Sequence, residues 1–131
     1  RPMPWLRATT WLRNGIRAVL SLHPMPYSVR QALERERVAV AYRELTDLSA
    51  PAFDEMREME ELIRGWRQES RPVYVHCYLG VGRSRTVASA YLAVEMDCCV
   101  EEAFDLAGRP QTARQREFVK EYLMRARAER R

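Results

Sequence analysis

The sequence has few cysteines, few lysines and no long apolar run. Its 131 residues include three cysteines, which is a small and odd number that does not suit a disulfide scaffold, so we expect a reduced, cytoplasmic setting. No apolar run approaches the roughly 20 residues that a membrane-spanning helix needs, and we expect no membrane association. No cluster of Cys and His residues has the spacing of a zinc site, so we predict no metal and no other cofactor.

The positive charge is carried almost entirely by arginine. Lys and Arg together number 22, and Lys120 is the one lysine, which leaves 21 arginines and a net charge of +4. This mild excess favours anionic partners without identifying them. The basic residues 125–131 lack the aromatic or glycine residues that accompany nucleic-acid-binding patches, so we expect a solvated helix end and no nucleic-acid partner.

Apolar runs that alternate with amphipathic segments predict the fold class. Apolar residues make up 47% of the chain, enough for a buried core in one domain that spans residues 1–131. Strands alternating with helices predict an α/β domain with a central, mostly parallel sheet flanked by helices. The predicted strands are residues 16–22, 38–45 and 73–76, and the predicted helices are residues 4–14, 28–35, 52–68, 83–96, 100–107 and 112–128, with Ser28 and Thr112 as caps.

The most informative stretch is residues 76–84, HCYLGVGRS, which is predicted to join a strand to a helix. Gly80 and Gly82 allow backbone N–H groups to converge, and such a loop at a helix N-terminus binds anions. Arg83 adds a planar fork of donors that matches phosphate. The same positive surroundings favour the thiolate form of Cys77, which is the reactive form. One loop therefore offers a nucleophile together with a phosphate-binding site.

This stretch resembles the H-C-x5-R-[S/T] signature of the cysteine-dependent protein tyrosine phosphatases. Asp47 precedes the cysteine by one helix and one strand, an order similar to that of the compact dual-specificity or atypical type. The resemblance extends to residues 15–22, 109–110 and 115–122. It implies a dual-specificity-phosphatase-like fold and metal-independent hydrolysis of phosphotyrosine, with phosphoserine and phosphothreonine as further substrates. A monomer that acts on phosphorylated proteins is expected.

The resemblance also assigns a role to each site residue. Cys77 attacks phosphorus and forms a phosphocysteine intermediate, while Asp47 protonates the leaving oxygen and then acts as a base toward water. The hydroxyl of Ser84 helps the Cys77 sulfur to leave, and His76 supports the loop. The oxygens of the phosphate are bound by the loop residues Tyr78, Leu79, Gly80, Val81, Gly82 and Arg83.

Other residues near the signature allow two interpretations. Asp54 is a rival acid, but it is expected in the first turn of a helix, where carboxylates are common for dipole reasons. Arg85 stands where many relatives have glycine, and it either adds positive charge at the mouth of the site or lies on the helix surface. Arg109 and Gln115 either approach the site or have a structural role.

The two remaining cysteines, Cys98 and Cys99, are expected to pack at a helix end. The alternative is a disulfide between one of them and Cys77, which would protect the nucleophile from oxidation.

Four alternatives to a protein phosphatase follow from the same loop. An RNA 5′-triphosphatase or a phosphoinositide phosphatase would keep the chemistry and change the substrate. Lipid-directed relatives often carry lysines in this loop, however, and residues 78–82 contain none. A rhodanese-like sulfurtransferase would not need Asp47 and Ser84. A catalytically inactive reader of phosphorylated residues would typically have lost the cysteine, the arginine or the acid, and this sequence has all three. The short chain leaves no room for a deep pocket wall, which favours a shallow site.

Overall fold

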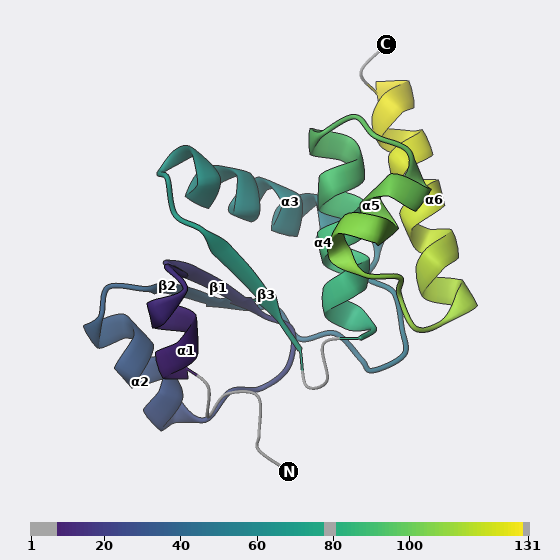
Figure 1. Cartoon of the computed structure of the whole chain (residues 1–131). Helices are drawn as coiled ribbons and strands as arrows, with labels where there is room; N and C mark the ends of the chain where they lie inside the picture. Colours follow the sequence, from purple (N-terminus) through teal and green to yellow (C-terminus); the bar gives the residue numbers. More distant parts are fainter. Residues whose placement is uncertain (1–7, 78–80, 130–131) are drawn as a thin grey trace. The chain divides into compact units, whose positions relative to one another are not determined.

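The computed structural model describes residues 8–77 and 81–129, whose elements are labelled in Figure 1. The described residues form two compact units. We call residues 8–44 with 61–77 the sheet unit, and residues 45–60 with 81–129 the helical unit. In chain order the elements are α1 (Ala8–Arg13), β1 (Ala18–Ser21), α2 (Tyr27–Arg35), β2 (Ala39–Tyr42), α3 (Phe53–Gln68), β3 (Val73–His76), α4 (Arg83–Glu95), α5 (Val100–Ala107) and α6 (Ala113–Glu129).

The sheet unit contains three parallel strands in the order β2-β1-β3. Ala18 pairs with Ala39 on one side and with Val73 on the other. Every residue of the central strand β1 is buried, as the near-continuous apolar run of residues 16–22 predicts for a strand that is covered on both faces. The prediction of an α/β fold with a parallel sheet is therefore confirmed.

Side chains from helices and loops complete the core of the sheet unit. Trp11, Val19, Leu33 and Val38 form a buried apolar cluster. At the amino-terminal end of the strands, the Arg71 guanidinium donates from Nη1 to the carbonyl oxygens of residues 17 and 37, both at 3.0 Å. This contact joins the segments that lead into β1, β2 and β3.

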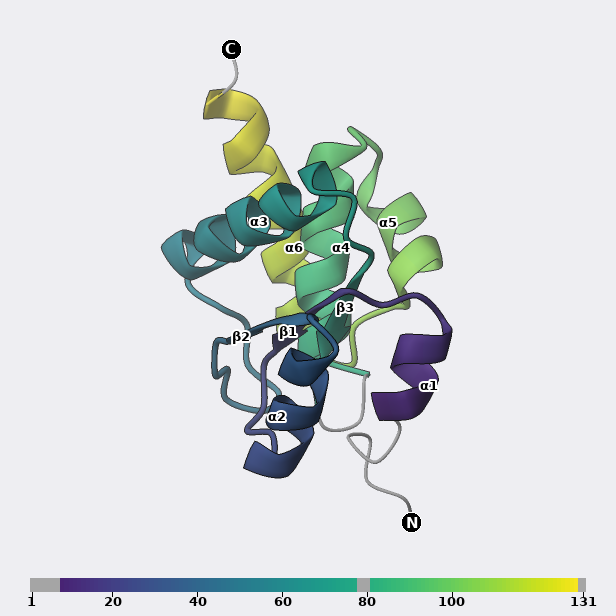
Figure 2. The ribbon, with the colours of Figure 1, turned by 90° about the vertical axis from the view of Figure 1, so that its left-hand side faces the viewer.

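The helical unit is organised around α4, against which α5 and α6 pack (Figures 1 and 2). The sequence pattern predicts one buried face that includes Ala88 and Leu92, but both residues are only half-buried. Burial instead extends around most of the helix and includes the polar residues Thr86 and Ser89. Its alanines and other small residues allow this close packing, which a periodicity of large apolar residues does not reveal.

Helix caps give one confirmed and one wrong prediction. Thr112 caps α6: its Oγ1 accepts the N–H of Gln115 at 3.1 Å, and Oε1 of Gln115 accepts the N–H of Thr112 at 3.0 Å. This reciprocal pair is a capping box. Ser28 is not a cap, because α2 begins one residue earlier, at Tyr27, with Pro26 at the N-cap position and no side-chain cap. The ring of Pro26 holds its φ at −56°, close to the helical value, so α2 begins without a hydrogen bond from a capping side chain.

The first half of α3 is held against α6 within the helical unit. The Arg125 guanidinium lies 3.6 Å from the centroid of the Phe53 ring, and the ring of Tyr122 lies 5.0 Å from it. The Tyr122 hydroxyl donates a hydrogen bond to the buried carboxylate of Glu60. These contacts fix the segment that directly follows the loop carrying Asp47.

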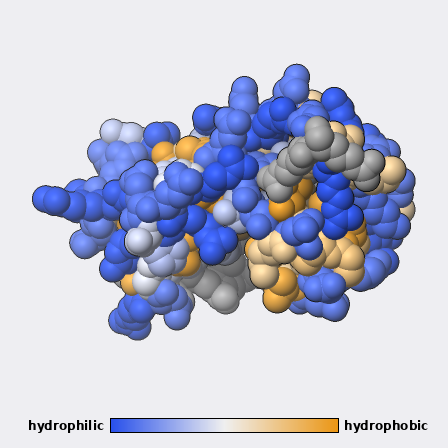
Figure 3. All heavy atoms as spheres, turned by 90° about the horizontal axis from the view of Figure 1, so that it is seen from above, coloured by the Kyte–Doolittle hydropathy of each residue, from blue (hydrophilic) through white to orange (hydrophobic). Residues whose placement is uncertain are grey.

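The face of the molecule shown in Figure 3 carries both hydrophilic and hydrophobic surface. Charged residues make up 31% of the sequence, and the face shown in Figure 3 is covered mostly by hydrophilic side chains. Within the part of the chain that the structure describes, none of the helices is both long and apolar enough to cross a membrane.

Candidate active site

Cys77 directly follows β3, at the carboxyl end of the parallel sheet. Its side chain is only 3% exposed. The preceding residue, His76, is fully buried, and its carbonyl oxygen accepts the N–H of Leu22 at 2.7 Å, which extends the pairing of β1 with β3. The His76 ring lies 5.3 Å from the Trp11 ring and 5.8 Å from that of Tyr74, measured between centroids. The backbone that leads into the cysteine is therefore fixed by the sheet and its core. Ligands bind at this edge in open α/β sheets.

Arg83 is the first residue of α4 and Ser84 is the second; both are buried. The carbonyl oxygen of Gly82 accepts two bonds from Thr86, one from the N–H at 2.9 Å and one from the hydroxyl at 2.8 Å. Two hydrogen bonds from Thr86 therefore hold the first turn of α4. A helix N-terminus presents N–H groups and the positive end of its dipole, as an anion site requires.

Residues 45–49, which we call the acid loop, carry Asp47 and are held by Arg83. The Arg83 Nη1 donates to the Leu45 carbonyl at 3.0 Å, and its Nε lies 3.5 Å from Oδ1 of Asp47. The guanidinium is 6% exposed, whereas the Asp47 side chain is 69% exposed. The structure therefore brings together two residues predicted for the site, with the carboxylate open to solvent beside a buried cation.

The acid loop also has an unusual backbone. Leu48 has a φ of +64°, in the left-handed region that residues with a Cβ rarely adopt. The Leu48 N–H donates to Oδ1 of Asp47 at 2.9 Å, and the Ser49 N–H donates to the Thr46 carbonyl at 3.2 Å. These local bonds stabilise a tight turn directly at the carboxylate.

Gln115 lies beside both the acid loop and the start of α4. It is fully buried, and its Nε2 donates to the carbonyl oxygen of Ser49 at 3.3 Å. A Cβ built on Gly82 would lie 3.0 Å from the same Nε2. The sequence left the role of Gln115 open, because its bonding partner is 66 positions away.

Three other candidates lie away from this cluster of bonds. Asp54 is an exposed residue in the first turn of α3, as the dipole argument predicts. Arg109 pairs with Glu101 at 3.0 Å on the surface. The guanidinium of Arg85 donates to the Arg109 carbonyl at 3.2 Å and packs on Gly108, where a Cβ would lie 2.6 Å from its Nε. Arg85 therefore joins α4 to the end of α5, which supports its structural interpretation.

None of the three cysteines, all of which lie in the described part of the chain, forms a disulfide. Cys98 is half-buried, and burial raises its pKa, with a further contribution from the carboxylate of Glu102. The thiol of Cys99 is exposed and lies 3.3 Å from an oxygen of the same carboxylate. The expected packing role at a helix end fits Cys98, while Cys99 lies on the surface.

The remaining predicted loop residues are only partly described. Val81 is half-buried and Gly82 is buried, while Tyr78, Leu79 and Gly80 lie outside the described residues. Within the described ranges, no three His, Cys, Asp or Glu side chains gather as a metal site would require.

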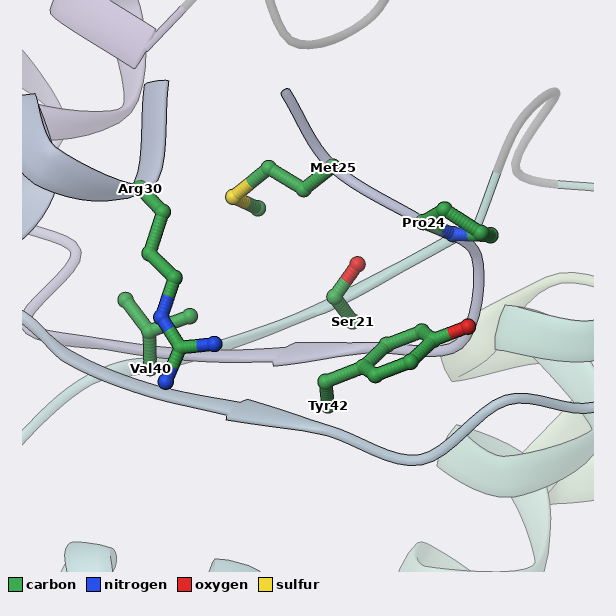
Figure 4. A pocket seen from close by; sticks show the side chains of 6 residues that line it. All are labelled: Ser21, Pro24, Met25, Arg30, Val40 and Tyr42. Atoms are coloured by element: carbon green, nitrogen blue, oxygen red, sulfur yellow. The ribbon is translucent and has the colours of Figure 1, made fainter. Parts of the chain in front are cut away.

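A small pocket lies at the carboxyl ends of β1 and β2. It has a volume of about 140 Å³, and Figure 4 shows the side chains of Arg30 and Tyr42 on either side of Ser21. Partial desolvation and then the nearby Glu44 carboxylate raise the pKa of Tyr42. The other lining residues are Pro24, Met25 and Val40.

Comparisons with known proteins give one family match and several solved structures of similar fold. Residues 10–127 match the family described as the dual specificity phosphatase catalytic domain, so the match includes residues of both units. Tk-PTP in its active form is 27% identical, with a TM-score of 0.82 over 95% of this chain and 89% of that chain. PTPMT1 in complex with PI(5)P is 20% identical, with a TM-score of 0.80 over 99% and 90% of the two chains. Kinase associated phosphatase is 19% identical, with a TM-score of 0.80 over 95% and 78%. A sequence search of curated proteins returned no match.

Proposed function

Because the chain belongs to the dual specificity phosphatase family, we propose that it hydrolyses phosphotyrosine in proteins, and also phosphoserine and phosphothreonine, through a phosphocysteine intermediate. Family and fold together make it a cysteine-based phosphatase. The observation that carries the finer proposal is the combination of the H-C-x5-R-S sequence with the Arg83–Asp47 ion pair, since it supplies a nucleophile, a phosphate ligand and an acid.

In the first step, the thiolate of Cys77 attacks phosphorus, a sulfur–phosphorus bond forms, and the bond to the leaving oxygen breaks. Asp47 gives its proton to that oxygen. Arg83 binds the phosphate oxygens, because its planar fork matches them and its orientation is already fixed by the Leu45 carbonyl. Preorganised donors of this kind stabilise the charge of the transition state without reorganising during the reaction.

In the second step, water attacks phosphorus and gives a proton to the carboxylate of Asp47. The sulfur–phosphorus bond breaks, inorganic phosphate leaves, and the Ser84 hydroxyl stabilises the departing Cys77 thiolate. The high exposure of Asp47 supports this role, since the carboxylate is accessible to solvent water. The two steps return the enzyme to its starting protonation state.

The composition of the loop supports a protein substrate over a highly anionic one. Residues 78–82 contain neither lysine nor arginine, so Arg83 supplies the loop's one full positive charge. A phosphoinositide carries further negative groups that would need additional cations. A lipid phosphate remains the second candidate, because PTPMT1, a protein of the same fold, is known in complex with PI(5)P.

A substrate panel tests the proposal. We expect kcat/KM for a phosphotyrosyl peptide to exceed that for PI(5)P and for RNA 5′-triphosphate, with measurable turnover of phosphoseryl and phosphothreonyl peptides. Activity should persist in the presence of a metal chelator. A kcat/KM for PI(5)P above that of every phosphopeptide would overturn the assignment to proteins and leave the phosphatase chemistry intact.

A further inference from the structure

We propose that Gln115 is a positioning residue that holds the acid loop in the geometry needed for proton transfer by Asp47. The inference rests on the proposed function and concerns one hydrogen bond, from the side-chain amide to the Ser49 carbonyl.

Gln115 uses both ends of its amide. The oxygen Oε1 accepts the N–H of Thr112 and completes the cap of α6, while the nitrogen Nε2 donates to the carbonyl of Ser49 at 3.3 Å. The side chain is fully buried, so water does not substitute for either partner. A capping box would be served equally well by glutamate. The donor function toward the acid loop is therefore what requires an amide at this position.

The bond from Gln115 fixes one end of the acid loop, and Arg83 fixes the other. The Leu45 carbonyl accepts from Arg83, and the Ser49 carbonyl accepts from Gln115. Between these two points lies Leu48, whose φ of +64° costs free energy. A strained residue persists when its surroundings hold it, and the two carbonyl bonds at the ends of the loop do so. Releasing one end allows the turn at Leu48 to relax and the neighbouring carboxylate to move.

Gln115 also lies against Gly82, directly before α4. A Cβ on Gly82 would meet Nε2 at 3.0 Å and Oε1 at 3.3 Å, so the amide is in close contact with the backbone directly before Arg83. The same side chain thus contacts Gly82, the residue before Arg83, and the loop that carries the acid. This position lets one residue set the relation between the two.

The test compares esters that differ in their need for the acid. The 4-nitrophenolate ion leaves readily without a proton, whereas the oxygen of phenyl phosphate needs one. We expect Gln115→Met to lower kcat/KM for phenyl phosphate by about 10-fold, the effect of losing one buried hydrogen bond, and for 4-nitrophenyl phosphate by less than about 2-fold. Gln115→Glu keeps the cap oxygen and removes the donor, so it should show the same pattern.

Thr112→Ala is the matched control. It removes the other half of the capping box and leaves the bond from Gln115 to Ser49 in place. We expect it to lower the midpoint of urea unfolding and to leave the ratio of the two kcat/KM values unchanged. Inorganic phosphate should bind Gln115→Met as it binds the wild type, because Cys77 and Arg83 are untouched. Equal losses for both esters in Gln115→Met, or a changed ratio in Thr112→Ala, would mean that Gln115 acts only through α6.

A double-mutant cycle separates this inference from the proposed function. In the Asp47→Ala background, the loss caused by Gln115→Met on phenyl phosphate should disappear, because no acid remains to be positioned. Persistence of that loss in the double mutant overturns the inference while the phosphatase assignment stands. Full activity of Cys77→Ser on either ester overturns the proposed function, and the inference with it.

Discussion

The sheet unit and the helical unit hold their proposed catalytic residues in different ways. Cys77 follows a strand whose backbone is bonded along its length to β1, and its environment is a buried core. Asp47 lies on a loop whose end carbonyls are bonded by the side chains of Arg83 and Gln115. A backbone ladder depends little on any one side chain, whereas a loop held by two side chains depends on each. We therefore expect the position of Cys77, the proposed nucleophile, to tolerate substitutions around it, and the position of Asp47, the proposed acid, to be sensitive to them.

The largest effect that bears on this difference is expected from Arg83→Lys. Lysine is a point charge without a planar fork, so it cannot bind the phosphate and the Leu45 carbonyl in the same way. We expect kcat/KM for phenyl phosphate to fall by about 10²–10³-fold. Steady-state kinetics of the wild type and Arg83→Lys measure this fall in kcat/KM.

Arg85→Lys is the control, two residues along the same helix, where the guanidinium packs on Gly108. It should change kcat/KM by less than about 2-fold. A loss comparable to that of Arg83→Lys would show that the contact with α5 matters for catalysis.

A smaller effect, on stability, is expected from Tyr122→Phe. The change removes the hydroxyl that donates to the buried carboxylate of Glu60 and weakens the attachment of α3 to α6 in the helical unit. We expect the free energy of unfolding to fall by about 1–3 kcal/mol, measured by urea denaturation. Tyr27→Phe, at a tyrosine that is 72% exposed, is the matched change in the sheet unit and should cost less than about 0.5 kcal/mol. Equal losses in the free energy of unfolding for the two variants would contradict a stabilising role for the hydrogen bond from Tyr122 to Glu60.

The smallest effect concerns the thiol of Cys98. Because its pKa is raised, a smaller fraction is thiolate at neutral pH, so iodoacetamide should alkylate it more slowly than it alkylates the same residue in the unfolded chain. Glu102→Gln removes the carboxylate that contributes to the raised pKa and should increase the rate. Mass spectrometry of peptides measures each site. An unchanged rate would mean that the Glu102 carboxylate does not contribute to the raised pKa of Cys98.

The sequence predicted the features that depend on local pattern. The fully buried central strand follows from the continuous apolar run of residues 16–22, and the cap at Thr112 from its place at the start of the last predicted helix. Strand β3, also expected to be buried, is buried only at His76, because its other three residues are partly exposed. The sequence assigns both Arg83 and Asp47 to the site, and the structure places Nε of Arg83 3.5 Å from Oδ1 of Asp47.

The features that the sequence did not predict depend on contacts between distant segments. The bond from Gln115 to Ser49 joins residues 66 positions apart, and no local pattern encodes it. The left-handed conformation of Leu48 contradicts the preference of leucine, because tertiary bonds hold the loop. The burial of Thr86 and Ser89 around α4 has no signal in the sequence for a related reason, since small polar residues do not contribute to an apolar stripe.

The most direct test of the central claim is to trap the intermediate. Asp47→Ala should still transfer phosphate from 4-nitrophenyl phosphate to sulfur but should hydrolyse the product slowly, because the base for water is missing. Acid quenching followed by peptide mass spectrometry should find one phosphate group on Cys77, with Cys98 and Cys99 unmodified as internal controls. Phosphate on either of the other cysteines, or on none while turnover continues, would contradict a mechanism through Cys77.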